Sequence, residues 1–297
     1  MVKPHDPVSG ARATPAWLPP LLEQRPASLS VRSNGTELNL LVWGERGRPG
    51  LFLLHGAGAN AHWWDWTAPL LARDYRVAAM SLPGCGGSGW RERYSSADFA
   101  EDAFACARAA GLEEAGLPLY AGHSMGGAHL FHGAVHAPER MRALILIDTS
   151  FRSPGARPRV AGARRFFATE QEAVHRFRLA PDTPAREPAL IEHIARNGLT
   201  RIDDGNGDPH WTWSHDPDFR AKFEPGLEQG PYSGPIPLAI PAAHIIANGS
   251  HVMLNPDATP LEESVPRIIL PDCGHHVMLD QPMALVAALR ALLATWP

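Results

Sequence analysis

The stretch LPLYAGHSMGGAHL, residues 117–130, decides the fold of this chain. Its first half is a short apolar run that ends in glycine, which is typical of a strand buried on both faces of a parallel sheet. Its second half opens a helical pattern, so strand and helix meet at the motif GHSMG (122–126). A turn this tight forces its central residue into a strained conformation, and the flanking glycines avoid backbone collisions. The pattern therefore predicts that the Ser124 hydroxyl stands clear of the sheet edge.

The same alternation of strands and helices extends over most of the chain. Residues 28–43 are two alternating runs around Asn34-Gly35, which is a β-hairpin signal. The order predicts an α/β fold with a doubly wound, mostly parallel sheet that has an antiparallel start. Apolar runs of the buried-strand type occur at 50–58, 75–84, 117–124, 141–148, 242–249 and 267–274, and helical patterns at 61–73, 95–111, 125–141 and 282–296.

Proline and glycine content divides the chain into three parts. Residues 1–27 form a proline-rich arm, and the predicted sheet core takes residues 28–148 and 241–297. Residues 149–240 contain many prolines, helix-like pieces and the aromatic stretch HWTWSHDPDF (210–219), but no clear buried strand. A segment of this kind between two core strands is expected to be an inserted, mainly helical lid.

Composition limits the partners of the chain. Its 297 residues are 44% hydrophobic and 20% charged, with a formal net charge of −4, which is ordinary for a globular protein. No run of like charges indicates nucleic acid or an anionic membrane as a partner, and no apolar run approaches the ~20 residues of a membrane span. The N-terminus lacks an apolar stretch of signal-peptide length, and the three cysteines are odd in number. We therefore expect a reduced, cytoplasmic setting.

A serine hydroxyl becomes an effective nucleophile only when a base removes its proton. Two adjacent histidines, His275 and His276, follow the last strand-like run. A loop that leaves the carboxyl end of a parallel strand lies on the same sheet edge as the Ser124 turn. Either histidine could therefore reach the serine.

Attack on a carbonyl also requires donors for the oxyanion that forms. The backbone N–H of Met125, directly after the serine, is one candidate. The second is the backbone N–H of Ala57, in the glycine-rich loop HGAG (55–58) after the first buried strand. His55 begins this loop, and we expect it to be a structural hydrogen-bonding residue and not the base.

With HGAG (55–58), GHSMGG (122–127) and GHHVMLDQP (274–282) in this order on the predicted strands, the chain resembles the α/β-hydrolase family. The resemblance covers residues 28–148 and 242–297 in detail, and the lid only by position. It implies a Ser–His–acid triad, acyl-enzyme chemistry and no cofactor. The family pattern at the last motif is a glycine, the base, four residues, an acidic residue, any residue and proline. This pattern selects His275 as the base.

The acid of the triad departs from the family pattern. Its usual place is a G-x-x-D turn after the next-to-last strand, and the turn here, GSHV (249–252), has valine at that position. Asp148 closes the strand-like run 141–148 on the same sheet edge, where some members of the family carry their acid. We predict that Asp148 orients His275. Asp257 remains the alternative, because a loop rearrangement could bring it near the histidine.

Aromatic residues near these motifs suggest the substrate class. Trp63 follows the oxyanion loop, and Trp211 and Trp213 lie in the aromatic stretch of the lid, so we expect them to line the pocket of a small, largely apolar substrate. A serine nucleophile then predicts hydrolysis of a carboxylic ester or lactone. Two alternatives stay open: hydrolysis of a carbon–carbon bond in dienoic ring-cleavage products, and a catalytically weak ligand-binding protein on the same scaffold.

Other reactive side chains are expected to be structural. Cys85 has no predicted base beside it, so it is not expected to be a catalytic thiol. His129, His132 and His136 share one helix face, but no cysteine or carboxylate accompanies them, and we expect no metal site. They are interpreted as a packed helix face or an interface, which leaves a homodimer open.

Overall fold

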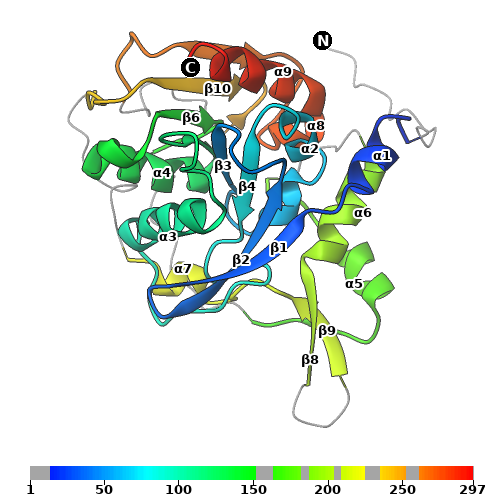
Figure 1. Ribbon diagram of the computed structural model, residues 1–297. Coiled ribbons are helices and arrows are strands. Elements are labelled where there is room, and N and C mark those ends of the chain that lie inside the picture. Colours follow the sequence, from blue (N-terminus) through cyan, green and yellow to red (C-terminus); the bar gives the residue numbers. More distant parts are fainter. Residues whose placement is uncertain are drawn as a thin grey trace.

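The computed structural model describes residues 14–151, 163–181, 187–203, 209–224, 235–251 and 261–296. These residues form an eight-stranded sheet in the order β1-β2-β4-β3-β5-β6-β10-β11 (Figure 1). The pairs β1–β2 and β2–β4 are antiparallel, and every further pair is parallel. The predicted fold class is therefore confirmed. The strands are β1 (Ala27–Ser33), β2 (Thr36–Trp43), β3 (Gly50–Leu54), β4 (Arg76–Met80), β5 (Leu119–His123), β6 (Ala143–Ile147), β10 (Ala242–Ala247) and β11 (Arg267–Leu270).

Alternate residues of the central strands bury their side chains on opposite faces of the sheet. In β3, Leu51 and Leu53 belong to the hydrophobic core of one face, and Phe52 and Leu54 to the core of the other. All five residues of this strand are buried. A strand with packed layers on both faces has no solvent side, which is why its sequence is a continuous apolar run.

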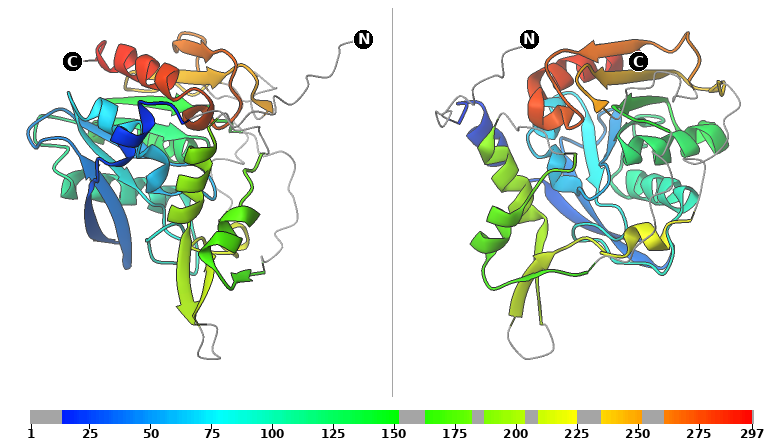
Figure 2. Two further views of the ribbon diagram at one scale, coloured as in Figure 1. Left: turned by 90° about the vertical axis from the view of Figure 1, so that its right-hand side faces the viewer. Right: turned by 180° about the vertical axis from the view of Figure 1, so that it is seen from behind.

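Helices cover both faces of the sheet (Figures 1 and 2). Residues of α3 and α4 pack into the core that contains Phe52, and residues of α2 and α9 pack into the core that contains Leu51. The Ser95 hydroxyl caps α3 by accepting the backbone N–H of Asp98. The helices of this part are α1 (Leu18–Leu22), η1 (Ala61–Trp64), α2 (Ala68–Leu71), α3 (Ser96–Ala109), α4 (Met125–His136), η2 (Pro138–Arg140), α8 (Val277–Asp280) and α9 (Pro282–Leu293).

The single helix predicted over 61–73 is wrong. The chain instead forms the 3₁₀ helix η1 and the short helix α2, separated by Asp65, Trp66 and Thr67. Pro69 lies in the first turn of α2. A proline is tolerated there because its missing N–H has no helical partner in any case, but it would break a helix that arrived from the preceding turn.

Between β6 and β10 the chain leaves the large sheet, and residues 149–240 are called the inserted segment below. Its described residues contain a three-stranded antiparallel sheet in the order β7-β9-β8, so the expectation of a mainly helical lid missed these strands. β8 and β9 extend away from the large sheet (Figures 1 and 2). The arm, core and lid boundaries remain predictions. The elements are β7 (Phe166–Phe167), α5 (Glu170–Arg176), α6 (Pro188–Asn197), β8 (Leu199–Asp203), β9 (Pro209–Trp213) and α7 (Phe219–Lys222).

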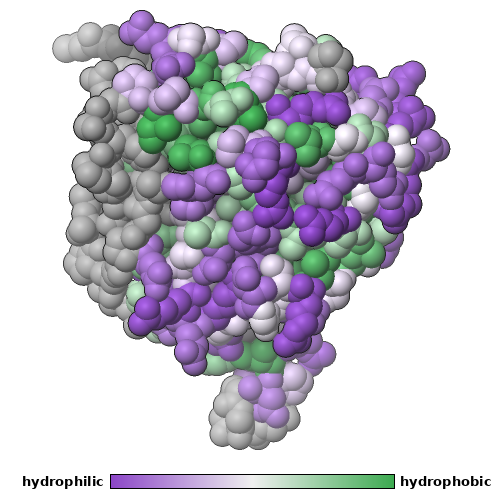
Figure 3. All heavy atoms as spheres, turned by 60° about the vertical axis from the view of Figure 1, so that its left-hand side comes forward, coloured by the Kyte–Doolittle hydropathy of each residue, from purple (hydrophilic) through white to green (hydrophobic). Residues whose placement is uncertain are grey.

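The described part of the N-terminal arm packs on the molecule. Leu18 and Leu21 of α1 are buried in the same hydrophobic cluster as Leu190 and Ile194 of α6. The face drawn in Figure 3 is largely hydrophilic, with apolar residues in small, separate groups. Among the described helices, none has the length and apolar character that crossing a bilayer requires.

Candidate active site

Ser124 lies in the turn between β5 and α4, as the sequence predicts. Its backbone is in the left-handed region, with φ of 52°, which is uncommon for a residue with a side chain. The backbone around Ser124 is packed so closely that the flanking glycines have no room for a side chain. A Cβ at Gly122 would lie 2.6 Å from the Cα of Gly127, and one at Gly126 would collide with the carbonyl oxygen of His55. The glycines are therefore required by close packing, and the strain is held at the serine.

His275 lies in the loop after β11 and reaches the serine. Its Nε2 is 3.0 Å from the Ser124 hydroxyl oxygen, and its Nδ1 is 2.6 Å from Oδ2 of Asp148. A carboxylate only accepts hydrogen bonds, so Nδ1 carries the proton in this pair. Nε2 then has the lone pair that faces the serine O–H. The structure thus brings together the three residues that sequence reasoning selected.

Asp148 directly follows β6, is fully buried and has φ of 43°. Two further donors hold its carboxylate: the Ser250 hydroxyl lies 2.5 Å from Oδ2, and the Ala247 backbone N–H lies 3.0 Å from Oδ1. Such a buried carboxylate needs donors of this kind. Sequence reasoning missed Ser250, although it lies in the turn GSHV (249–252), where the family usually carries its acid. The alternative acid Asp257 lies outside the described residues.

Two neighbouring histidines support the site without contacting the serine hydroxyl. His123 donates from Nε2 to the backbone carbonyl of His275, at 2.8 Å. His55 donates from Nδ1 to the Gly56 carbonyl and accepts the N–H of Leu82 at Nε2. Burial lowers the pKa of His55 to about 4. With both ring nitrogens occupied, His55 has the structural hydrogen bonds that we expected of it.

The two N–H groups proposed for an oxyanion lie beside the serine. Ala57 is in the exposed loop after β3, and Met125 opens α4. The chain at Gly56 passes so close that a Cβ there would lie 3.1 Å from that of Ser124. Within the described part of the chain, neither N–H has a recorded acceptor. Both therefore remain available to a ligand oxygen.

A cavity of about 430 Å³ lies between the oxyanion loop and the inserted segment. Trp63 and Trp213 line it, as does Ala57, whereas Trp211 is not among its lining residues. Trp211 is two residues nearer the outer end of β9, where the hairpin leaves the core (Figure 1). Two residues along a strand correspond to about 6–7 Å, and this distance separates the Trp211 side chain from the cavity that Trp213 lines.

His276 also lines the cavity. It is buried, donates from Nε2 to the backbone carbonyl of Pro181 at 3.3 Å, and meets the Trp63 ring edge-on at 5.4 Å between centroids. Burial, and after it electrostatic repulsion from the neighbouring His275 ring, lowers the pKa of His276 to about 4. A neutral ring that contacts both the core and the inserted segment fits a packing role.

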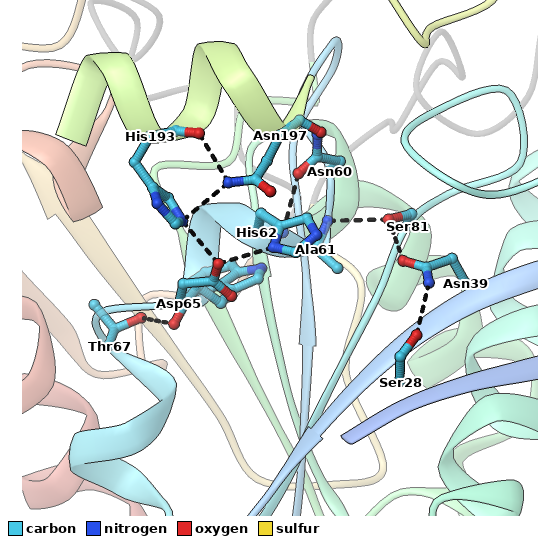
Figure 4. A network of polar contacts seen from close by, with 11 residues as sticks. Ser28, Asn39, Asn60, Ala61, His62, Asp65, Thr67, Ser81, His193 and Asn197 are labelled. Carbon is cyan, nitrogen blue, oxygen red and sulfur yellow. Dashed lines mark hydrogen bonds and ion pairs between the residues drawn. The ribbon is translucent and has the colours of Figure 1, made fainter. Parts of the chain in front are cut away.

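A polar network joins the inserted segment to the core beside the cavity (Figure 4). Oδ2 of Asp65 accepts hydrogen bonds from Nδ1 of His62 and from Nε2 of His193 in α6, each at 2.8 Å. The Asn60 amide donates to the backbone carbonyl of Asn197 at 3.0 Å. Among the described residues, His62, Asp65 and His193 are the group whose ligand atoms lie close enough to hold a metal ion. Here both histidines bind Oδ2 of Asp65, whereas Oδ1 is buried without a hydrogen-bond partner in the described part of the chain. We call the three residues the core–α6 clamp.

The remaining candidates lie away from the serine. Burial raises the pKa of the Cys85 thiol to about 12, so it stays protonated at neutral pH. His129 is buried against the Phe99 ring and within hydrogen-bond distance of the Ser96 hydroxyl. The rings of His132 and His136 lie 4.3 Å apart between centroids, tilted by 42° to each other. These contacts are those of a packed helix face.

Comparison with known proteins places this arrangement in a family. The model of the alpha/beta hydrolase family matches residues 51–289, which is most of the chain. The match spans all the strands from β3 to β11 and the loops that carry Ser124, Asp148 and His275. The chain belongs to the alpha/beta hydrolase family and is an enzyme of that family.

Individual relatives agree with this assignment. Esterase Rv0045c of Mycobacterium tuberculosis is 26% identical over 275 residues, which cover 87% of each chain. A pimeloyl-[acyl-carrier protein] methyl ester esterase of Edwardsiella ictaluri is 36% identical over 104 residues, covering 35% of this chain and 38% of that protein. The solved structure of E-2-(acetamidomethylene)succinate hydrolase shares the fold, with a TM-score of 0.75 at 19% identity over 90% of this chain and 99% of that one.

Proposed function

We propose that this enzyme hydrolyses a carboxylic ester or lactone through an acyl-enzyme intermediate. The observation that carries the proposal is the hydrogen-bonded chain from Ser124 through His275 to Asp148, with distances of 3.0 and 2.6 Å. The same three residue types in this geometry are the recurring solution to activating a serine at neutral pH.

In the first half of the reaction, Oγ of Ser124 attacks the ester carbonyl while Nε2 of His275 takes the hydroxyl proton. The carbonyl oxygen becomes an oxyanion, which the N–H groups of Ala57 and Met125 stabilise. Each such donor is worth about 10²–10³ in rate in related chemistry. The imidazolium then gives its proton to the leaving alcohol oxygen, and the carbon–oxygen bond breaks. Asp148 keeps the imidazole in the correct tautomer and stabilises its positive charge.

In the second half, water replaces the alcohol. Nε2 of His275 removes a proton from the water as the oxygen attacks the acyl carbon of the Ser124 ester. The collapse of the second tetrahedral intermediate returns the proton to Oγ of Ser124 and releases the carboxylic acid.

The two curated relatives support the ester as the scissile group. Both carry the name esterase, and the mycobacterial protein matches over most of both chains. Valine at the family's usual acid position favours the alternative of a catalytically weak binding protein. Asp148, fixed by Ser250 and by the backbone of Ala247, supplies a carboxylate to His275 and supports an active enzyme.

We also propose that the enzyme acts in a reducing compartment, with the cytoplasm as the expected location. Cys85, Cys106 and Cys273 are all buried, and no disulfide joins any two of them. An odd number of cysteines with no disulfide among them is more common where thiols are kept reduced. Fractionation of cells that express the full chain tests this, and recovery outside the cytoplasm would contradict it.

The test of the proposed function uses a fluorophosphonate probe and a short-chain nitrophenyl ester. We expect the probe to modify Ser124, located by peptide mass spectrometry, and the ester to be hydrolysed. Ser124→Ala should abolish labelling and lower kcat by about 10⁴-fold or more. Ester hydrolysis that survives in Ser124→Ala, or labelling at another residue, would overturn the assignment.

A further inference from the structure

Positive charge is concentrated in the first part of the inserted segment. Residues 152–186 contain eight arginines and three acidic residues, a formal net charge of +5, whereas the whole chain carries −4. A strongly basic stretch in an otherwise acidic protein calls for an anionic partner. Its described arginines show where that partner would bind.

Four of these arginines line the cavity: Arg164, Arg165, Arg176 and Arg178. No aspartate or glutamate is among the lining residues that the structure describes. Uncompensated guanidinium groups around a partly enclosed space create a positive potential inside it, because the low-dielectric walls screen less than water does. The cavity wall that the inserted segment provides is thus cationic.

The four guanidinium groups are not neutralised by nearby carboxylates in the described part of the chain. The Arg164 guanidinium lies over the Trp90 ring, 4.5 Å from its centroid, and Nη1 of Arg178 donates to two backbone carbonyls. Glu170 of α5 and Glu192 of α6 both form ion pairs with Arg196 instead. The positive charge at the cavity therefore stays available to a ligand.

Ser124 and His275 are not among the described residues that line this cavity, but immediate neighbours of the proposed catalytic residues form its opposite wall. Ala57 lines it, and His276 also lines it with its ring 5.4 Å from that of His275. Apolar side chains such as Phe177 and Trp213 complete the lining. One ligand in the cavity would thus meet an oxyanion donor, an apolar surface and the arginine-bearing wall.

We propose that the substrate of this enzyme is an ester or thioester that carries an anionic oxygen group, a carboxylate or a phosphate, bound by Arg164, Arg165, Arg176 and Arg178. The inference rests on the proposed function for the location of the scissile bond. Guanidinium groups suit such anions because their planar N–H donors match two oxygens at once. This revises the small, largely apolar substrate expected from the aromatic residues: the apolar part remains, and an anion is added to it.

The test compares substrates that differ only in charge. Mono-(4-nitrophenyl) glutarate and 4-nitrophenyl pentanoate have acyl chains of equal length, and only the first ends in a carboxylate. Butyryl-coenzyme A and S-butyryl-N-acetylcysteamine form the phosphate arm. At low ionic strength we expect kcat/KM to favour the anionic member of at least one pair by tenfold or more, mainly through KM, and salt to reduce the preference.

Arginine variants test whether the preference for anionic substrates arises at the cavity. Arg176→Gln/Arg178→Gln and Arg164→Gln/Arg165→Gln should each bring the ratio of kcat/KM between the anionic and the neutral member of the favoured pair close to one. The matched control Arg32→Gln/Arg48→Gln removes two exposed arginines of the core and should leave this ratio unchanged. Equal kcat/KM within both pairs, or a preference that both cavity variants retain, would overturn the proposal.

A binding measurement separates this proposal from the proposed function. The Ser124→Ala variant is titrated calorimetrically with each member of both pairs. Tighter binding of an anionic member that disappears in the arginine variants supports the anion site even if the wild type hydrolyses nothing. Equal binding of charged and neutral members overturns the anion site, even if ester hydrolysis is fast.

Discussion

At the scale of single residues, the carboxylate of Asp148 decides whether His275 can act as a base. Asp148→Asn keeps the size of the side chain but replaces the acceptor by an amide, which no longer fixes the imidazole tautomer or stabilises its charge. We expect kcat to fall by 10²- to 10⁴-fold with little change in KM. Asp257→Asn is the matched variant and should have little effect. Equal, small effects of both would remove the acid assignment and leave the nucleophile intact.

Ser250 is a second residue whose contribution can be isolated. Its hydroxyl lies on Oδ2 of Asp148, the same oxygen that bonds to His275. Ser250→Ala leaves the carboxylate one donor short and less firmly oriented, so we expect kcat to fall by roughly 3- to 30-fold. Ser250→Thr retains the hydroxyl and should restore most of the activity. A threonine variant as slow as the alanine variant would show that the hydrogen bond is not the cause.

At the scale of elements, the core–α6 clamp (His62, Asp65 and His193) holds the inserted segment on the sheet. Burial alone would raise the pKa of Asp65, but hydrogen bonds from His193 and His62 outweigh it and hold that pKa below its usual value. His193→Gln should cost about 1–2 kcal/mol of local stability.

The expected readout is faster amide exchange in α6 with unchanged exchange in α4. His175→Gln, on the exposed face of α5, serves as the control. Uniform acceleration across the whole sheet would contradict a local clamp.

At the scale of the whole molecule, buried neutral histidines make the fold sensitive to acid. Burial lowers the pKa of His55, His244 and His276 to about 4 and that of His129 to about 3, from an ordinary value of 6.5. The unfolded chain therefore binds more protons than the folded one between about pH 6.5 and 4. The free energy of unfolding must fall as the pH falls through this range.

Calorimetry or circular dichroism measures this effect. We expect Tm at pH 5 to lie about 10 °C or more below that at pH 7.5. His129→Gln should make the pH dependence shallower. A Tm that is constant between these two pH values would contradict the argument.

Local sequence patterns were sufficient for much of the fold. The apolar runs identified β3, β5 and β6 because these strands are buried on both faces, and the GHSMG motif placed Ser124 because its glycines admit no alternative. The pattern failed where tertiary contacts override it. Residues 61–73 form two short helices, and HWTW (210–213) lies in β9, which pairs with the preceding strand β8 and with β7, a strand much earlier in the chain.

The sequence by itself determined the order along the chain of the large sheet's strands and the sheet edge at which Ser124, Asp148 and His275 lie, since periodicity and tight-turn chemistry act between near neighbours. Only the tertiary structure decided that Ser250 completes the Asp148 site and that four arginines share a cavity with the oxyanion loop. Such convergence depends on distances between residues far apart along the chain, and a hydroxyl or a guanidinium has no local signature that specifies its distant partner.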